Sequence, residues 1–208
     1  EAPTIAELVQ LIVHARRDQP GAERDSIQML PRLGDLPLSF SQERVWFLQQ
    51  LNPSAAAYHF QATLHMLGRL DPAALERSLA ELVRRHEILR TTFPARAGRP
   101  IQLVHPAQPV ELPIIDLQGA PNPTAAAYER IAAELGAPFD LTRLPLIRWS
   151  LLRLRSDEHI LLHVEHHLLH DGWSFNLFLR ELLAIYQAFC AGRPSPLPEP
   201  AIQFVDYA

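Results

Sequence analysis

Several residues able to carry acid–base chemistry stand close together near the end of the chain. Between His166 and Ser174 the sequence reads HHLLHDGWS, which places three histidines, an aspartate and a glycine within seven residues. An imidazole titrates at about 6.5, so a histidine in such a cluster is able to accept a proton at neutral pH. The cluster is open to three interpretations: a metal site, a catalytic base with its supporting residues, or a structural turn whose histidines do no chemistry.

Strand geometry argues against the metal site. The stretch HVEHH that leads into the cluster reads as a strand, in which His163, Glu165 and His167 share one face and His166 lies on the other. His163 and His167 would then lie roughly 13 Å apart, because a strand advances about 3.3 Å per residue. The zinc-protease spacing HExxH is absent, and the inverted form HxxEH is missed because position 162 is Leu162. We therefore expect no metal ligands here.

The base and the structural turn cannot be separated from these residues alone. As a base, His167 would emerge at a strand end and be held by polar neighbours in the turn that follows. Gly172 would allow a positive φ and fold that turn tightly beneath the histidine. His159, His163 and His170 are expected to be solvated or structural.

Composition limits the classes of protein that fit. The chain has 208 residues, of which 48% are hydrophobic and 20% charged, as expected for a soluble domain with a sizeable core. A formal charge of −4 argues against nucleic acid as a partner, and no apolar run reaches the length of a membrane span. The single cysteine, Cys190, excludes an intrachain disulfide and fits a reducing, cytoplasmic compartment. We see no signal peptide at the start of the chain.

Helical and extended patterns alternate along the chain, which predicts an α/β fold. A first helix over 3–17 is followed by a polar linker over 21–35, and the main domain begins near Leu36. N-caps are expected at Ser39, Asp71 and Ser174. The expected helices are 38–51, 70–90, one within 123–141 that stops near Gly136 and Pro138, and one within 174–193 that stops at Gly192. The stretches 58–67 and 146–169 are expected to form a strand and a hairpin that turns at SDEH, and 99–106 and 110–117 to form short strands or extended segments.

Four stretches then carry a resemblance to a known family. HHLLHDGWS resembles the HHxxxDG signature of condensation domains of nonribosomal peptide synthetases. LPLSFSQERVWFLQQL (36–51) and RHEILRTTF (85–93) resemble their first two core motifs, and AIQFVDYA (201–208) resembles the start of the motif after HHxxxDG. The resemblance implies a chloramphenicol acetyltransferase-like lobe, with a two-layer mixed sheet and helices packed on it. It covers 36–208 and ends where the first lobe ends, so the second lobe is missing. Residues 1–20 resemble the C-terminal helix of a preceding carrier domain.

The resemblance also implies roles for single residues. His167 is expected to be catalytic, and His166, Asp171, Gly172, Arg90 and Arg85 to be supporting. A buried ion pair with Asp171 is expected, with Arg90 as the first choice of cation.

The implied reaction is amide formation between two carrier-bound thioesters, the donor on an upstream carrier and the acceptor on a downstream one. The chain itself binds no cofactor, because phosphopantetheine is attached to the carriers. The missing second lobe and an adjacent adenylation domain are the other expected partners, in a peptide or a hybrid polyketide/peptide synthetase. Donor, acceptor and donor configuration stay open.

Two other functions remain as alternatives. One is a standalone acyltransferase that uses a coenzyme A thioester, and the other is a docking fragment without activity. The carrier-like first helix and the first two motifs argue against the standalone acyltransferase.

Overall fold

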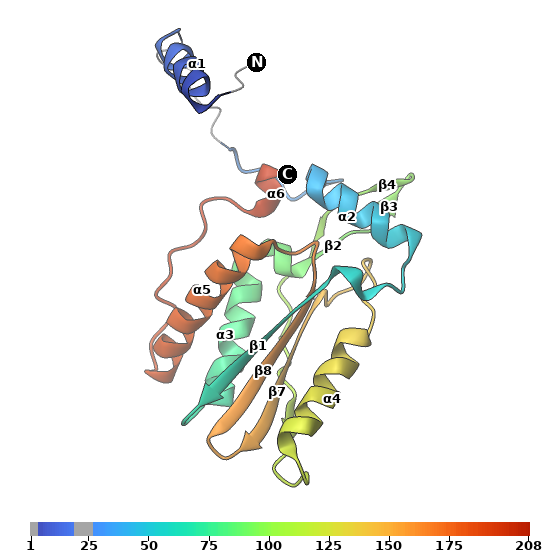
Figure 1. Cartoon of the computed structure of the whole chain (residues 1–208), viewed down its shortest axis with the longest axis vertical. Coiled ribbons are helices and arrows are strands. Elements are labelled where there is room, and N and C mark those ends of the chain that lie inside the picture. The colour runs from blue at the N-terminus through green and yellow to red at the C-terminus, as the bar shows by residue number, and fades with distance from the viewer. Residues whose placement is uncertain (1–3, 19–26) are drawn as a thin grey trace.

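A four-stranded mixed sheet forms the centre of the protein, in the order β1-β8-β7-β6. The structure is a computed structural model that describes residues 4–18 and 27–208 (Figure 1). Its helices are α1 (Ile5–Asp18), α2 (Phe40–Leu51), α3 (Pro72–Arg85), α4 (Pro123–Gly136), α5 (Gly172–Cys190) and α6 (Phe204–Tyr207), with 3₁₀ helices η1 (Ala56–Tyr58) and η2 (Glu87–Arg90). Its strands are β1 (His59–Leu67), β2 (Thr91–Thr92), β3 (Ala95–Arg96), β4 (Arg99–Pro100), β5 (Leu103–Val104), β6 (Ile114–Asp116), β7 (Ile147–Arg155) and β8 (Glu158–His166).

The predicted hairpin supplies the two inner strands of the sheet. β7 and β8 pair antiparallel and turn at Ser156 and Asp157, as the SDEH sequence predicts. β1 pairs antiparallel with the other side of β8, with His59 opposite His166, whereas β6 lies parallel to β7. β8 is therefore bonded along both sides, and its C-terminal end is held firmly.

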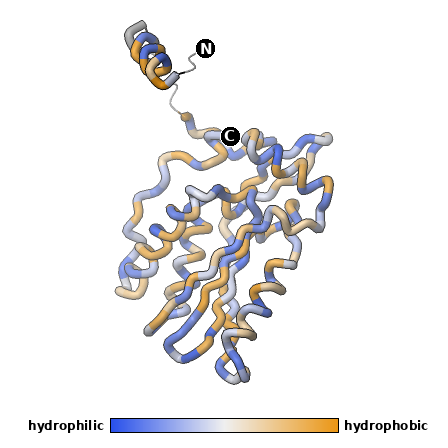
Figure 2. Tube along the Cα trace, viewed as in Figure 1, coloured by the Kyte–Doolittle hydropathy of each residue, from blue (hydrophilic) through white to orange (hydrophobic). Residues whose placement is uncertain are grey.

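Helices cover both faces of this sheet, which confirms the α/β prediction. α3 and α5 lie side by side on one face, where His163 of β8 meets Phe175 and Phe178 of α5 (Figure 1). α4 covers the other face, where His166 meets Phe139 just beyond that helix. The strands β7 and β8 are mostly buried, as expected for strands covered on both sides, although hydrophilic residues interrupt their hydrophobic ones (Figure 2). The residues at the centre of the core include Leu79, Leu82, Leu151, Leu161 and Ile185.

Local capping signals place two of the helix starts correctly. The side chain of Asp71 accepts from the Ala74 N–H and caps α3, and Ser39 caps α2 in a capping box with Gln42. The expected helix 70–90 is too long, because α3 ends at Arg85 and the chain continues as η2 after an extended His86. The expected cap at Ser174 is wrong: Asp171 caps α5, and Ser174 is the residue whose N–H it accepts.

The second half of the predicted linker packs against the lobe. Positions 21–26 lie outside the described residues, but Arg32 bonds two carboxylates from distant parts of the chain. Its Nε donates to Glu87 at 2.6 Å, and its two terminal nitrogens bond Asp206 at 2.6 and 3.0 Å. The guanidinium, helped by N–H groups of Gln203 and Leu30, lowers the pKa of Asp206 to about 2. We call Arg32, Glu87 and Asp206 the Arg32 clasp; it ties the segment before the lobe to α6.

Five apolar side chains of the first helix are exposed. Ile5 is 84% exposed, and Leu8, Val9, Leu11 and Val13 are exposed as well. In the ranges 4–18 and 27–208, no helix has the length and apolar character needed to cross a membrane.

Candidate active site

His167 lies directly beyond the end of β8, with its side chain exposed. It borders a groove of about 890 Å³ between the start of α2, the loop Leu168–Asp171 and α6. Its main-chain N–H donates to the Tyr58 carbonyl at 2.8 Å, which extends the β1 pairing by one step. The predicted position of His167, at the end of a strand, is confirmed.

The His167 ring is oriented by one hydrogen bond. Its Nδ1 lies 2.9 Å from the main-chain carbonyl oxygen of His170. A carbonyl oxygen only accepts, so Nδ1 carries the proton of the neutral ring. Nε2 is then the nitrogen with the free lone pair, and it is the one able to take a proton from a group in the groove.

The preceding histidine, His166, is fully buried and has a structural role. Its Nδ1 accepts from the Leu168 N–H at 3.2 Å, and its Nε2 lies 3.4 Å from Gln49 Oε1. The bond to Leu168 turns the chain sharply after β8, and the turn leaves His167 outside. Two adjacent histidines therefore have opposite environments.

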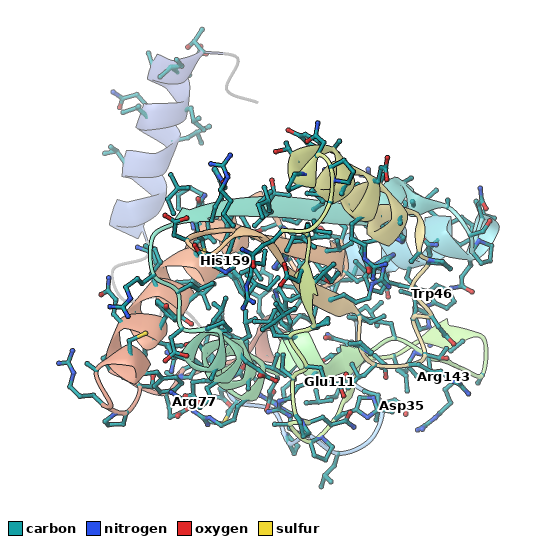
Figure 3. All side chains as sticks on the ribbon, turned by 90° about the horizontal axis from the view of Figure 1, so that it is seen from below. Asp35, Trp46, Arg77, Glu111, Arg143 and His159 are labelled. Atoms are coloured by element: carbon teal, nitrogen blue, oxygen red, sulfur yellow. The ribbon has the colours of Figure 1, made fainter. Side chains whose placement is uncertain are left out.

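Two buried glutamines on α2, which the sequence reasoning missed, support this turn. Gln42 donates to the Leu168 carbonyl at 3.0 Å, and Gln49 accepts from His166. The two glutamines stand seven residues apart on a helix, hence on one face, and this polar spacing on a buried face was the available signal. Trp46, labelled in Figure 3, lies between them in the sequence and donates to the Phe93 carbonyl at 2.9 Å. The first sequence motif is thus bonded to each of the other two.

The expected ion pair between Arg90 and Asp171 is wrong. Asp171 is exposed, and its carboxylate accepts from the N–H and hydroxyl of Ser174 at 2.9 and 2.7 Å. These bonds lower the pKa of Asp171. Arg90 instead donates to the His105 carbonyl, with Glu87 3.8 Å away. A helix N-terminus already attracts the carboxylate, so no arginine is needed there.

Gly172 also differs from expectation. It does not have a positive φ; it is the first residue of α5, and a Cβ added there would meet no atom within 4 Å. Glycine at this position therefore leaves open space at the start of α5, and does not relieve backbone strain.

The second motif forms a junction with Glu181 of α5. Arg85 is buried, and its Nε lies 3.2 Å from Glu181, whose carboxylate is also 2.5 Å from His86 Nε2. Gln203 bonds the Arg85 carbonyl at 2.9 Å and the Glu87 N–H at 3.0 Å, which connects this junction to the Arg32 clasp. Arg85 thus lies in the scaffold, away from His167.

Replacing Asp171 by alanine should cost only what a lost helix cap costs, about 1 kcal/mol of unfolding free energy. Asp171→Asn should retain most of the stability, since asparagine caps equally well. Because Arg90 and Asp171 do not touch, the effects of Arg90→Ala and Asp171→Ala should add to within about 0.5 kcal/mol. Urea unfolding of these three variants and of the double variant Arg90→Ala/Asp171→Ala measures this. A loss of unfolding free energy above about 3 kcal/mol for Asp171→Ala would contradict the role of a simple helix cap and support a buried ion pair.

The buried histidines are held neutral. Burial lowers the pKa of His163 to about 3, and burial with the nearby His59 and His167 lowers that of His166 to about 4. In each ring Nδ1 accepts from an N–H, that of Trp149 for His163 at 3.0 Å and that of Leu168 for His166. Protonating either ring would break its bond. Neither histidine is solvated, and in the described part of the chain no cluster of possible ligands could hold a metal ion.

Stability should therefore fall as the pH falls from 7.5 to 5.0. In this window the unfolded histidines bind protons while the folded ones do not, so the unfolding free energy decreases with decreasing pH. The loss for each of the two histidines is about 2 kcal/mol at pH 5. Urea midpoints across this range measure it. Burial also lowers the pKa of His170 to about 4, so His170 adds a similar loss and His163→Gln should flatten the pH dependence by about a third. The exposed His65, changed to glutamine, should leave it as it is. A midpoint independent of pH would contradict the neutral state of both rings.

Sequence comparisons place this geometry in a family. The family model of the condensation domain matches residues 33–208. Chondramide synthase of Chondromyces crocatus is 45% identical over 181 residues, which cover 86% of this chain and 5% of that protein. Malpibaldin synthetase of Mortierella alpina is 40% identical over 212 residues, 100% of this chain and 4% of the relative. The chain thus spans a small part of the proteins it resembles.

Solved structures agree with the sequence comparison. The X-domain in complex with OxyB from teicoplanin biosynthesis has a TM-score of 0.79 and 35% identity, over 90% of this chain and 40% of that one. The first condensation domain of the calcium-dependent antibiotic synthetase in complex with a substrate analogue has a TM-score of 0.75 and 32% identity, over 80% of this chain and 40% of that one. With the fold, the three bonded motifs and the family match in agreement, the chain belongs to the condensation-domain family.

Proposed function

We propose that this chain is the histidine-bearing lobe of an enzyme that joins a carrier-bound acyl or peptidyl thioester to the amine of a carrier-bound aminoacyl group. The observation that carries the proposal is the orientation of His167. Its Nδ1 is occupied by the His170 carbonyl, and the side chain is exposed to a groove, so Nε2 is free to accept a proton there.

The chemistry needs little more than placement and one proton acceptor. The acceptor amine attacks the thioester carbonyl, the C–N bond forms, and the amine proton passes to Nε2 of His167. Collapse of the intermediate breaks the C–S bond, and the proton returns to the thiolate that leaves. An α-amine has a pKa of about 7.7–8.0, so a useful fraction is neutral before it binds, and positioning provides much of the acceleration.

The open side of the groove supports the need for a second lobe. Phe40 is 92% exposed and Tyr207 67% exposed where they border the groove, and Trp173 at the start of α5 is 86% exposed. The chain covers about 40% of the solved condensation domain in complex with its substrate analogue. We infer that a further lobe covers these side chains and encloses the two pantetheine arms.

The uncovered apolar side of α1 supports a carrier domain upstream. Ile5, Leu8 and Leu11 are exposed on this helix, as they would be if the rest of a helical domain packed there. The similarity to malpibaldin synthetase extends over the whole chain and so includes this helix.

The test compares donors and chain lengths. A protein that joins this chain to a second lobe receives the donor either on a carrier or as its coenzyme A thioester, with the acceptor on a carrier, and the amide is followed by mass spectrometry. We expect carrier-bound donors to react, and the 208-residue chain alone to be at least about 10²-fold slower. Equal turnover of coenzyme A thioesters by the chain alone would favour a standalone acyltransferase. Absence of turnover with both donors would favour a docking module.

A further inference from the structure

A buried carboxylate lies close to His167 in the chain. Glu165, the next-to-last residue of β8, exposes 3% of its side chain and stands between Phe60 of β1 and Ile147 of β7. A carboxyl group in such a place is costly unless it is paired. Its partners are two histidines: Oε2 lies 3.3 Å from His163 Nε2, and Oε1 contacts His170 Nδ1 directly.

His170 connects this carboxyl group to His167. Its ring is 7% exposed and packs edge-on against Phe60, with centroids 4.4 Å apart. The ring of Phe175 lies tilted against it, with centroids 6.1 Å apart. Its main-chain carbonyl accepts the Nδ1–H of His167. One residue is thus anchored through its side chain while its backbone holds the exposed histidine.

We propose that Glu165 and His170 are positioning residues for His167. Glu165 anchors the His170 ring, the anchored residue presents its carbonyl oxygen at a fixed place, and that oxygen keeps the proton of His167 on Nδ1. The lone pair of Nε2 then faces the groove. The effect on rate rests on the proposed function, whereas the effect on the ring of His167 does not.

We place the proton of the pair on the Glu165 carboxyl group. Burial, together with the nearby His163, lowers the pKa of His170 to about 4, so its ring is neutral at pH 7. Apolar surroundings also disfavour an ionised carboxylate beside neutral rings, which favours a protonated Glu165 carboxyl group where it contacts His170 Nδ1. A glutamine at position 165 reproduces this donor through its amide N–H.

The ring of His167 reports on the proposal directly. In the ¹⁵N-labelled 208-residue protein, the two ring nitrogens have separate resonances that identify the protonated one, and His167→Gln assigns them. We expect Nδ1–H in the wild type and in Glu165→Gln. Glu165→Leu, and His170→Phe, which keeps an aromatic ring between Phe60 and Phe175, should shift His167 towards Nε2–H. Glu181→Gln is the matched control, because that carboxylate is also buried and bonded to a histidine, His86, but faces Arg85.

Rates provide the second measurement. In the two-lobe enzyme, Glu165→Leu and His170→Phe should lower kcat by about 10²-fold with little change in the acceptor KM, and the double variant should be no slower than either single one. Glu165→Gln should stay within about threefold of the wild type. An unchanged His167 tautomer in folded Glu165→Leu and His170→Phe would overturn the proposal, as would the same shift in Glu181→Gln. If the enzyme makes no amide at all, the proposed function fails while the tautomer result still decides this inference.

Discussion

His167→Ala is expected to lower the rate of amide formation by about 10²- to 10⁴-fold and to leave the lobe folded. The substitution removes Nε2, the one ring nitrogen with a free lone pair, and the side chain it truncates is exposed. The hydrogen bond from the His167 main chain to Tyr58 does not depend on the side chain, so the C-terminal end of β8 stays paired with the start of β1. The unfolding free energy should change by less than about 0.5 kcal/mol.

Single-turnover amide formation in the two-lobe enzyme and urea unfolding of the same variant measure these two effects. His65→Ala, at an exposed histidine of β1, serves as the control for both. His167→Asn separates two roles, because asparagine orients an amine by a hydrogen bond but does not take its proton. A variant that retained full rate would show that His167 is not the proton acceptor, and one that lost stability would show that the ring also supports the fold.

His166→Ala should have the opposite result and unfold the lobe far more easily, by about 3–5 kcal/mol. The ring is fully buried and packs against Phe139 and Tyr58. Its loss leaves a cavity, and it also leaves the Leu168 N–H and the Gln49 oxygen without their partner. Both effects act in the same direction.

Urea unfolding at pH 7.5 measures the loss, at a pH where the wild-type ring is neutral. His166→Asn is the matched variant, because its side-chain oxygen is able to accept from the Leu168 N–H in place of Nδ1. It should recover part of the loss. If His166→Ala unfolded like the wild type, the sharp turn after β8 would not depend on this ring.

Features that depend on neighbours in sequence were predictable. Asp71 with Pro72, and Ser39 with Gln42, mark helix starts by local hydrogen bonds, and both capped helices begin where expected. The alternation along β1 and the turn of the hairpin follow from side-chain direction in a strand. The place of His167 followed because a strand must end before the turn residues that the cluster contains.

Features that depend on distant residues were not predictable in the same way. Asp171 could have met an arginine or a helix N-terminus, and nothing in the neighbouring residues decides between them until α5 is placed. The choice between Asp171 and Ser174 as the cap was equally open, since both types cap well. Glu165 and His170 meet only because the chain folds back after β8, and sequence patterns record no such return. Gln42 and Gln49 stand seven residues apart, a spacing that places them on one face of a helix. That spacing did not predict their burial, because a buried glutamine and a surface glutamine look alike in sequence.

The Arg32 clasp has a consequence for recombining synthetases. The side chain of Asp206 is 0% exposed, so removal of Arg32 leaves a buried carboxylate without its cation. The family match begins at residue 33 and therefore omits Arg32. A fusion boundary chosen at the edge of the match would exchange Arg32 for whatever residue the upstream donor supplies. A boundary upstream of Leu30 moves Arg32 together with Glu87 and Asp206, and it also keeps the Leu30 N–H on Asp206. The segment that has to be moved as one piece is thus longer than the part matched by the family model. A fusion that leaves Arg32 behind loses the bonds of the Arg32 clasp.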